Sequence, residues 1–214
     1  MPCLIVQTIV QDGCGCQDRT VDAVVQKVID DVVGAAERHD ATKENRLDRW
    51  RVLEPDAGRF LWFLTQAVGA RSIIGIGTSR GVSTLWLADA ARGTGGHVLS
   101  IDLDAAAQQE ARRNVVEAGL ADHVTFRVED GGTALAGLPD GSVDLLFLDA
   151  ERTEYPSWWP HPARVLRVGG VLVADNALSH PAEIAPLRDL IEQDGRLTTT
   201  TIGVGKGELL ALRR

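Results

Sequence analysis

From residue 71 onward, short apolar runs alternate with longer amphipathic segments, and this alternation limits the folds open to the chain. The runs include RSIIGIG, HVLSID, VTFRVE, VDLLFLD and GVLVAD, and segments such as DAAAQQEARRNVVEAG and AEIAPLRDLIEQD lie between them. Strands that alternate with helices of this length form βαβ units, in which helices cover both faces of a parallel sheet. The chain is therefore predicted to be an α/β protein with a doubly wound sheet.

The C-terminal end of the chain departs from this alternation. LTTTTIG and GELLALR are separated only by VGK, a spacing that favours an antiparallel hairpin over another crossover helix. Upstream, YPSWWPHPARVL, residues 155–166, is expected to form the helix after the fourth strand. Together these segments predict about seven strands, of which the last are antiparallel.

Length and composition are consistent with one compact domain. With 214 residues and 44% hydrophobic content, the chain can bury a large core, and no change in composition marks a second domain. Apolar residues at helical spacing predict two helices ahead of the sheet, one after a Thr20 that could cap it and one through PDAGRFLWFLTQAVGA. We divide the chain into an N-terminal arm with helices, residues 1–54, and a ligand-binding domain, residues 55–214.

The charge pattern argues against large anionic partners. The formal net charge is -8 and Lys and Arg are scattered singly, whereas nucleic acids and anionic membranes select clustered positive charge. The apolar run near the N-terminus has no basic leader and is too short to span a membrane, so we expect a cytoplasmic protein with a small-molecule partner. Cys3, Cys14 and Cys16 lack the further ligands of a zinc site and are interpreted as reduced thiols.

In a doubly wound sheet, ligands bind beyond the carboxyl ends of the strands, so the residues at those ends are the candidate site. The first strand ends in GIGTSRG, where Gly75, Gly77 and Gly81 allow a tight turn and a close approach to a ligand, or serve packing alone. The second ends at Asp102, which could accept hydrogen bonds from both ribose hydroxyls, unless it replaces Asp104 as a helix cap. The pair indicates a nucleoside ligand without saying which one.

Acidic residues also end the later strands. The third ends in VEDGG, where Glu129 or Asp130 and the glycines could contact an adenine, and a plain loop is an equal alternative. Asp149 ends the fourth strand, and Asp175 and Asn176 end the fifth. Carboxylates at adjacent strand ends repel each other, so a cation is expected between them, and all-oxygen ligands suit Mg²⁺ or Ca²⁺. The alternative is that Asp149 caps a helix and Asn176 shapes a turn.

In this order, the motifs resemble those of the class I S-adenosylmethionine-dependent methyltransferases, and more narrowly the metal-dependent O-methyltransferases related to catechol and caffeoyl-coenzyme A O-methyltransferases. IIGIGTSRGVSTLWLA is similar to the cofactor loop of that family, VLSIDLD to its ribose strand, VDLLFLDAERTEYPSWW to its metal and catalytic loop, GGVLVADN to its second metal strand and VGKGELLALR to its closing hairpin. The resemblance covers residues 55–214 and implies a Rossmann-like sheet of order 3-2-1-4-5-7-6.

The resemblance implies transfer of a methyl group from S-adenosylmethionine to a hydroxyl of a small phenolic or catechol-like acceptor held by Mg²⁺ or another divalent cation. Its metal ligands would be Asp149, Asp175 and Asn176, with Asp149 and Arg152 at the catalytic centre. The residues expected to bind the cofactor are Gly75, Gly77, Thr78, Gly81, Ser83, Asp102, Leu103, Asp130, Gly131 and Asp149. The N-terminal helices would help to cover the pocket and to form a homodimer.

Three positions depart from the pattern of the family. Gly75 stands where a Glu is common, so one contact to the cofactor is absent or supplied elsewhere. Arg152 stands where a Lys base is common, and a guanidinium is a poor proton acceptor, so Arg152 is either an electrostatic clamp or a surface residue paired with Glu151 or Glu154. Lys206 stands where Asp is common and is interpreted as a surface residue, with a displaced base as the alternative.

Two other functions fit part of the pattern. An NAD(P)-dependent oxidoreductase would also use GxGxxxG and Asp102, but it needs no acidic cluster, and the chain has no YxxxK pair. A non-catalytic nucleoside-binding homologue would explain the loss of a base at Arg152.

Overall fold

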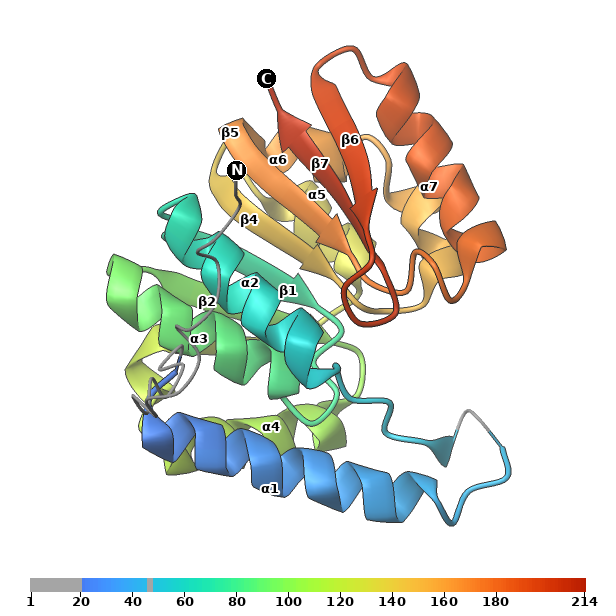
Figure 1. The fold of residues 1–214 in the computed structure, drawn as a ribbon. Helices are drawn as coiled ribbons and strands as arrows, with labels where there is room; N and C mark the ends of the chain where they lie inside the picture. Colours follow the sequence, from blue (N-terminus) through green and yellow to red (C-terminus); the bar gives the residue numbers. More distant parts are fainter. Residues whose placement is uncertain (1–20, 46–47) are drawn as a thin grey trace, which may run out of the picture.

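The computed structural model describes residues 21–45 and 48–214 and contains a seven-stranded sheet of order β3-β2-β1-β4-β5-β7-β6 (Figure 1). The strands from β1 to β5 pair in parallel, and β7 pairs antiparallel with β5 and β6. The α/β class, the strand order and the closing hairpin are therefore confirmed. The strands are β1 (Ser72–Ile76), β2 (His97–Asp102), β3 (Val124–Val128), β4 (Val143–Leu148), β5 (Leu166–Ala174), β6 (Leu197–Ile202) and β7 (Glu208–Arg213).

Helices cover both faces of the sheet (Figure 1). One layer contains α1 (Ala23–Asp40), α2 (Pro55–Ala67), α3 (Val82–Thr94) and α4 (Ala105–Glu117), and the other contains α5 (Gly131–Gly137), α6 (His161–Val165) and α7 (Pro181–Gln193). Two 3-10 helices, η2 (Ala121–His123) and η3 (Arg152–Trp158), join these elements. None of the described helices is both long and apolar enough to cross a bilayer.

The central strands are buried on both faces because helices cover both. Ile73 and Phe147 face the layer of α1 to α4, and Ile74 and Leu146 face the layer of α5 to α7. All four side chains are at most 4% exposed. Burial of an aliphatic or aromatic side chain of this size stabilises the folded state by about 1.5–3 kcal/mol. Because both faces are buried, the sequences of these strands are continuous apolar runs and do not alternate between apolar and polar residues.

The segment after β4 differs from its prediction. In place of one helix over residues 155–166, the chain forms η3 and then the short α6. Pro160 and Pro162 fall between or within the two pieces and carry no backbone N–H, so a continuous helical hydrogen-bond ladder cannot form there. The prediction of a single helix over residues 155–166 is therefore wrong.

The N-terminal cap also differs. Asp22 precedes α1, and its Oδ1 accepts a hydrogen bond from the backbone N–H of Val24 at 2.8 Å. Thr20, the predicted cap, lies outside the described residues, as do Cys3, Cys14 and Cys16 with most of the predicted arm. The division into residues 1–54 and 55–214 stays a prediction, although α1 packs directly on the sheet-covering helix α3.

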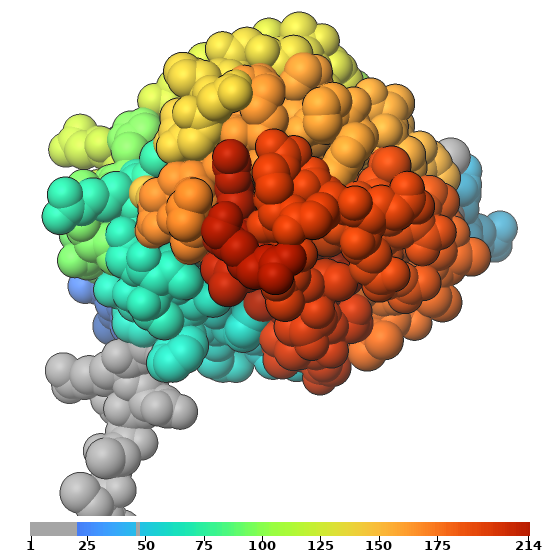
Figure 2. Space-filling model, turned by 90° about the horizontal axis from the view of Figure 1, so that it is seen from above, coloured from blue at the N-terminus to red at the C-terminus, as the bar shows by residue number. Residues whose placement is uncertain are grey.

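The closing hairpin lies beside the start of α2, although the two are far apart in the sequence. In a view from above, the hairpin (red) adjoins the α2 region (teal) (Figure 2). The Gly205 N–H donates to Asp56 Oδ2 at 3.1 Å, and a Cβ on Gly205 would lie 2.9 Å from the Ala57 Cβ. The turn between β6 and β7 therefore reaches the carboxyl edge of the sheet, where α2 begins.

Gly77 brings the loops after β1 and β4 into contact. It follows β1 with φ of 98°, and a Cβ built there would lie 2.1 Å from the carbonyl oxygen of Asp149. Its N–H donates to Ile101 O at 2.9 Å, so the backbone is also held against β2. Only glycine avoids both the steric overlap and the left-handed backbone strain.

We therefore expect Gly77→Ala to destabilise the protein by more than 2 kcal/mol, because the methyl group has no space and its φ is unfavourable. Urea unfolding of the full chain measures this. Gly75→Ala is the matched control, since a Cβ there meets only Leu87 Cδ1 at 3.8 Å and its φ is ordinary, and it should cost far less. Equal costs for the two variants would contradict the steric argument.

Candidate active site

The backbone fixes the two central acidic residues side by side. The Asp149 N–H donates to Ile76 O at 2.8 Å, and the Asp175 N–H donates to Leu148 O at 3.0 Å. Each bond continues a parallel ladder one residue past the end of a strand. Asp149 and Asp175 are therefore held at adjacent strand ends, as predicted.

A cavity of about 690 Å³ opens at this edge of the sheet, a size typical of small-molecule sites. It is lined by the segment 48–52, by loops that follow β1 to β5 and by Lys206 of the hairpin turn. Among the residues predicted for the site, those that line it are Gly77, Asp102, Leu103, Gly131, Asp149, Arg152, Asp175 and Asn176. Those that do not line it are Gly75, Thr78, Gly81, Ser83 and Asp130.

Asp102 organises the loop after β1. Its Oδ2 accepts hydrogen bonds from the backbone N–H groups of Thr78 at 2.7 Å and Ser79 at 3.0 Å, and its Oδ1 accepts one from the Asp104 N–H at 2.9 Å. Asp104, not Asp102, caps α4, because its Oδ1 accepts from Ala106 and Ala107. A carboxylate has room for about four hydrogen bonds, so Asp102 keeps acceptor capacity toward the cavity.

Two glycines predicted to touch the cofactor do not line the cavity. Gly75 lies inside β1, between Ser100 and Phe147, and is buried. Gly81 begins α3 with φ of 88°, and a Cβ there would lie 2.9 Å from the Ala111 Cβ of α4. Gly81 therefore permits close packing of two helices behind the cavity.

Polar residues beside them are also internal. Thr78 is 2% exposed, and its hydroxyl lies 2.8 Å from Ser100 Oγ. Ser83 is buried in the first turn of α3. Asp130 caps α5 by accepting from the Thr133 N–H at 2.7 Å, and its neighbour Glu129 lines the cavity. The short helix α5, which begins at Gly131, was not predicted. Because Asp130 caps this helix, Glu129 and not Asp130 lines the cavity.

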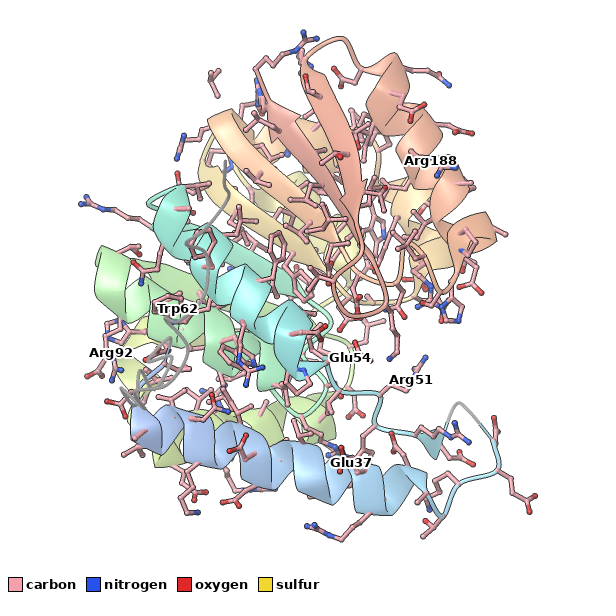
Figure 3. The ribbon with its side chains drawn as sticks, viewed as in Figure 1. Glu37, Arg51, Glu54, Trp62, Arg92 and Arg188 are labelled. Atoms are coloured by element: carbon pink, nitrogen blue, oxygen red, sulfur yellow. The ribbon has the colours of Figure 1, made fainter. Side chains whose placement is uncertain are left out.

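The segment 48–52 is a part of the site that sequence patterns did not reveal. Its Trp50 carbonyl accepts a hydrogen bond from Ser79 Oγ at 2.8 Å, and the Arg80 guanidinium lies 4.2 Å from the Trp50 ring centroid. Arg51 and Glu54 lie on the stretch that leads into α2, near the hairpin turn (Figure 3). Contacts between distant parts of the sequence thus attach the segment 48–52 to the loop after β1.

The two central carboxyl groups are unfavourable as anions. Burial, followed by the charge of Asp175, raises the pKa of Asp149 well above its usual range. Burial also raises the pKa of Asp175 to about 6, and Glu54 adds to that effect. A bound cation would remove this penalty, because it favours both ionised forms.

Asn176 lies beside Asp175, but its amide nitrogen and not its amide oxygen points toward the carboxylate. Its backbone N–H and Nδ2 donate to the two carboxylate oxygens of Asp175 at 2.5 and 2.7 Å, and Ser179 Oγ donates to its Oδ1 at 3.2 Å. A rotation of the amide would turn Oδ1 toward the carboxylates. Within residues 21–45 and 48–214, no three His, Cys, Asp or Glu side chains converge on one metal position, so a cation here depends on this amide.

Arg152 is neither a surface residue nor a partner of Glu151 or Glu154. Its side chain is 5% exposed, and its Nε and Nη2 lie 2.7 and 2.6 Å from Oε2 of Glu183 on α7. This buried ion pair fixes the catalytic-loop segment to α7. A guanidinium held in this way cannot act as a base.

Lys206 is exposed, as its interpretation as a surface residue predicted, and it also lines the cavity. Its side chain is 43% exposed and forms an ion pair with Glu54, which precedes α2. Its charge acts on Asp149 and Asp175 and partly offsets their repulsion. A cation therefore lies beside the acidic pair.

Glu208 is a further acidic residue that was missed. It is the first residue of β7, it is fully buried, and a side-chain hydrogen bond joins its carboxyl group to that of Asp175. Burial, then the charges of Asp175 and Asp149, raises its pKa to about 9. A Glu in the apolar run GELLALR was the available signal.

Comparisons with known proteins agree with this geometry. The sequence profile of the O-methyltransferase family matches residues 34–214. The chain belongs to the O-methyltransferase family. A provisionally named O-methyltransferase from Mycobacterium sp. (strain KMS) is 31% identical over 222 residues, covering 94% of this chain and 97% of the relative.

Solved structures show the same fold. The O-methyltransferase from Bacillus cereus in complex with SAH matches with a TM-score of 0.72 and 26% identity, over 90% of this chain and 91% of that one. Cofactor-bound Rv0187 from MTB matches with a TM-score of 0.71 and 29% identity, over 86% and 89%. This O-methyltransferase family membership decides against the NAD(P)-dependent oxidoreductase.

The raised pKa values predict how the stability of the cation-free O-methyltransferase depends on pH. Glu208 and Asp175 keep their protons in the folded state to about pH 9 and 6, whereas their ordinary values are 4.5 and 3.8. The unfolded chain loses these protons first, so the free energy of unfolding falls as pH rises through this window.

Glu208→Gln removes the larger of these two effects. We expect the variant to be more stable than wild type at pH 9 by at least on the order of 1 kcal/mol, and nearly equal to it at pH 4.5. Urea unfolding in chelator at several pH values measures the difference. A gap between the two proteins that does not widen with pH would contradict the raised pKa of Glu208.

Proposed function

We propose that the protein is an S-adenosylmethionine-dependent O-methyltransferase that holds the hydroxyl of a small phenolic or catechol-like acceptor on a divalent cation. The observation that carries this proposal is the pair Asp149 and Asp175, fixed by backbone hydrogen bonds at adjacent strand ends in the cavity that also contains Asp102. SAH is bound to the Bacillus cereus relative and supports the choice of cofactor.

The β1 to β3 side of the cavity suits the nucleoside half of the cofactor. Asp102 has acceptor capacity for ribose hydroxyls, and Leu103 is 65% exposed beside it, so a purine would cover an apolar side chain. Glu129 lies at the end of β3 on the same wall. Gly77 has no side chain, so the backbone between this half of the cavity and Asp149 stays closely packed.

The β4 to β5 side suits a divalent cation and an acceptor. Asp149, Asp175 and Asn176 would supply only oxygen ligands, which suits Mg²⁺. Burial first, and then neighbouring carboxyl groups, raises the pKa values of Asp149 and Asp175, and a cation would favour their ionised forms. A divalent cation in this position supplies Lewis-acid chemistry that lowers the pKa of an acceptor hydroxyl. Trp158, 5% exposed, provides a flat apolar wall for a planar acceptor.

No dedicated lysine base is required in this arrangement. Arg152 holds Glu183 and thereby positions the loop that follows Asp149. Lys206 forms an ion pair with Glu54. The acceptor proton is therefore expected to leave to solvent, while the cavity orients the hydroxyl toward the methyl donor.

Asp102→Asn tests the cofactor half. Loss of one carboxylate oxygen should weaken binding of S-adenosylhomocysteine by roughly tenfold to a hundredfold, because charge-assisted bonds to ribose hydroxyls are lost. Calorimetry on the full chain measures the affinity. Asp130→Asn, at the α5 cap, is the control and should bind like wild type. Tight binding of NAD⁺ instead would contradict the assignment.

Asp149→Asn and Asp175→Asn test the acceptor half. Each should lower methyl transfer by at least roughly a hundredfold while the protein stays folded, because removal of a repelled buried carboxyl does not weaken the apolar core. Asp122→Asn, an exposed residue of η2, is the control.

The assay follows S-adenosylhomocysteine formation over phenols, catechols and small amines, with and without Mg²⁺. Full activity in excess chelator would falsify the cation part of the proposal. Turnover with amines alone would reject the oxygen acceptor. Cofactor binding without any turnover would favour the non-catalytic homologue.

A further inference from the structure

Arg51 differs from the other cations on the wall of the cavity. Five Arg and Lys side chains line the cavity, and all of them except Arg51 are engaged with another residue. The engaged side chains are Arg49 with the Lys43 carbonyl, Arg80 with Glu110, Arg152 with Glu183 and Lys206 with Glu54. Arg51 is exposed, and within residues 21–45 and 48–214 its guanidinium has no hydrogen bond or ion pair. Its charge is therefore left for a ligand.

The backbone holds Arg51 in a conformation that residues with a side chain rarely adopt. Its φ is 48°, in the left-handed region. Asp40, at the end of α1, stabilises this conformation, because its Oδ1 accepts from the Trp50 N–H at 2.8 Å and its Oδ2 accepts from the Arg51 N–H at 3.2 Å. Residues held in such conformations cluster at functional sites, which supports a role for Arg51 in binding.

Trp50 fixes the same stretch through its ring and its carbonyl. The ring stacks on His39 with centroids 4.2 Å apart, and the Arg80 guanidinium lies 4.2 Å from the Trp50 centroid. The carbonyl accepts from Ser79 Oγ at 2.8 Å. Contacts with α1 and with the loop after β1 therefore position Arg51 before a ligand binds, and a preorganised donor loses less entropy on binding.

Arg51 lies next to the acceptor half of the cavity. Further along the same stretch, Glu54 forms an ion pair with Lys206, and the charges of both act on Asp175. Figure 3 shows the Arg51 side chain on the stretch before α2, directed toward the hairpin turn. A ligand group bound by Arg51 would therefore lie at the exposed edge of the cavity, on the side of the acidic strand ends.

We propose that Arg51 binds a carboxylate group of the acceptor, so that the acceptor is an acidic phenol or catechol. The inference rests on the proposed function, because it requires an acceptor hydroxyl on the β4 to β5 side. A guanidinium forms two parallel N–H···O bonds to a carboxylate, which recognise its charge and fix its orientation. A divalent cation between Asp149 and Asp175 would offset their negative charge, so an anionic acceptor is compatible with this wall.

The test compares catechol with protocatechuate, a catechol that carries one carboxylate, as acceptors for the full chain with S-adenosylmethionine and Mg²⁺. Arg51→Met keeps most of the side-chain length and removes the charge. It should raise the KM for protocatechuate by roughly tenfold, because a charge-assisted bond to the carboxylate is lost. The KM for catechol should stay within about twofold of wild type, and kcat should change little for either acceptor, because the contact is the same in the ground state and the transition state.

Two further variants and one binding measurement complete the test. Arg51→Lys keeps the charge without the fork and should fall between wild type and Arg51→Met. Arg113→Met removes one exposed charge from α4, away from the cavity, and should behave like wild type. Calorimetry gives the affinity of each protein for S-adenosylhomocysteine, and then the affinity of the loaded protein for both acceptors, without turnover.

The outcomes separate this inference from the proposed function and from the carboxylate of the cofactor. If wild type binds protocatechuate no more tightly than catechol, or if Arg51→Met affects both acceptors alike, the inference is wrong, and methyl transfer to catechol would still support the proposed function. If Arg51→Met instead weakens binding of S-adenosylhomocysteine, the guanidinium binds the amino-acid end of the cofactor, and its assignment to the acceptor is wrong.

Turnover of neither acceptor would count against the proposed function, and the binding comparison would still decide the role of Arg51. Urea unfolding shows that each variant is folded. Arg, Lys and Met all carry a Cβ, so the substitutions leave the cost of the left-handed φ unchanged.

Discussion

The close approach of two loops at the centre of the sheet is the constraint on which the rest of the site depends. Gly77 has no Cβ, so the loop after β1 lies against the Asp149 carbonyl, and the N–H of Asp149 in turn extends the ladder from Ile76. The loops after β1 and β4 are therefore in contact, and both line the same cavity. A bulkier residue at this point would push the loops after β1 and β4 apart.

The residues that differ from the family pattern form a connected electrostatic set. Arg152 forms an ion pair with Glu183, which attaches the segment after β4 to α7. Lys206 forms an ion pair with Glu54, which attaches the hairpin turn to the start of α2. Glu208 is buried beside Asp175, and a side-chain hydrogen bond joins the two carboxyl groups. Both cations are therefore held in ion pairs, while the acidic groups lie together at the ends of β4 and β5 and the start of β7.

Much of the fold could be predicted because parallel strands buried on both faces leave a strong pattern of short apolar runs. Strand-end positions for Asp102, Asp149 and Asp175 followed from that pattern, since all carboxyl ends of parallel strands share an edge. The break between η3 and α6 and the short helix α5 were missed, because prolines and a local Asp130 cap override weak helical periodicity. The segment around Trp50 was also missed, since its contacts come from distant loops.

The sequence by itself determined the α/β class, the closing hairpin and which acids lie at strand ends, because these depend on local periodicity and on the common edge of a parallel sheet. Only the tertiary structure decided which side chains face the cavity and which are neutralised. From their sequence positions Arg152 and Lys206 are both loop cations, yet Arg152 is buried against α7 and Lys206 is exposed at the hairpin turn. Pairing, burial and charge depend on distances between segments far apart in the chain, and no spacing within a segment encodes those distances.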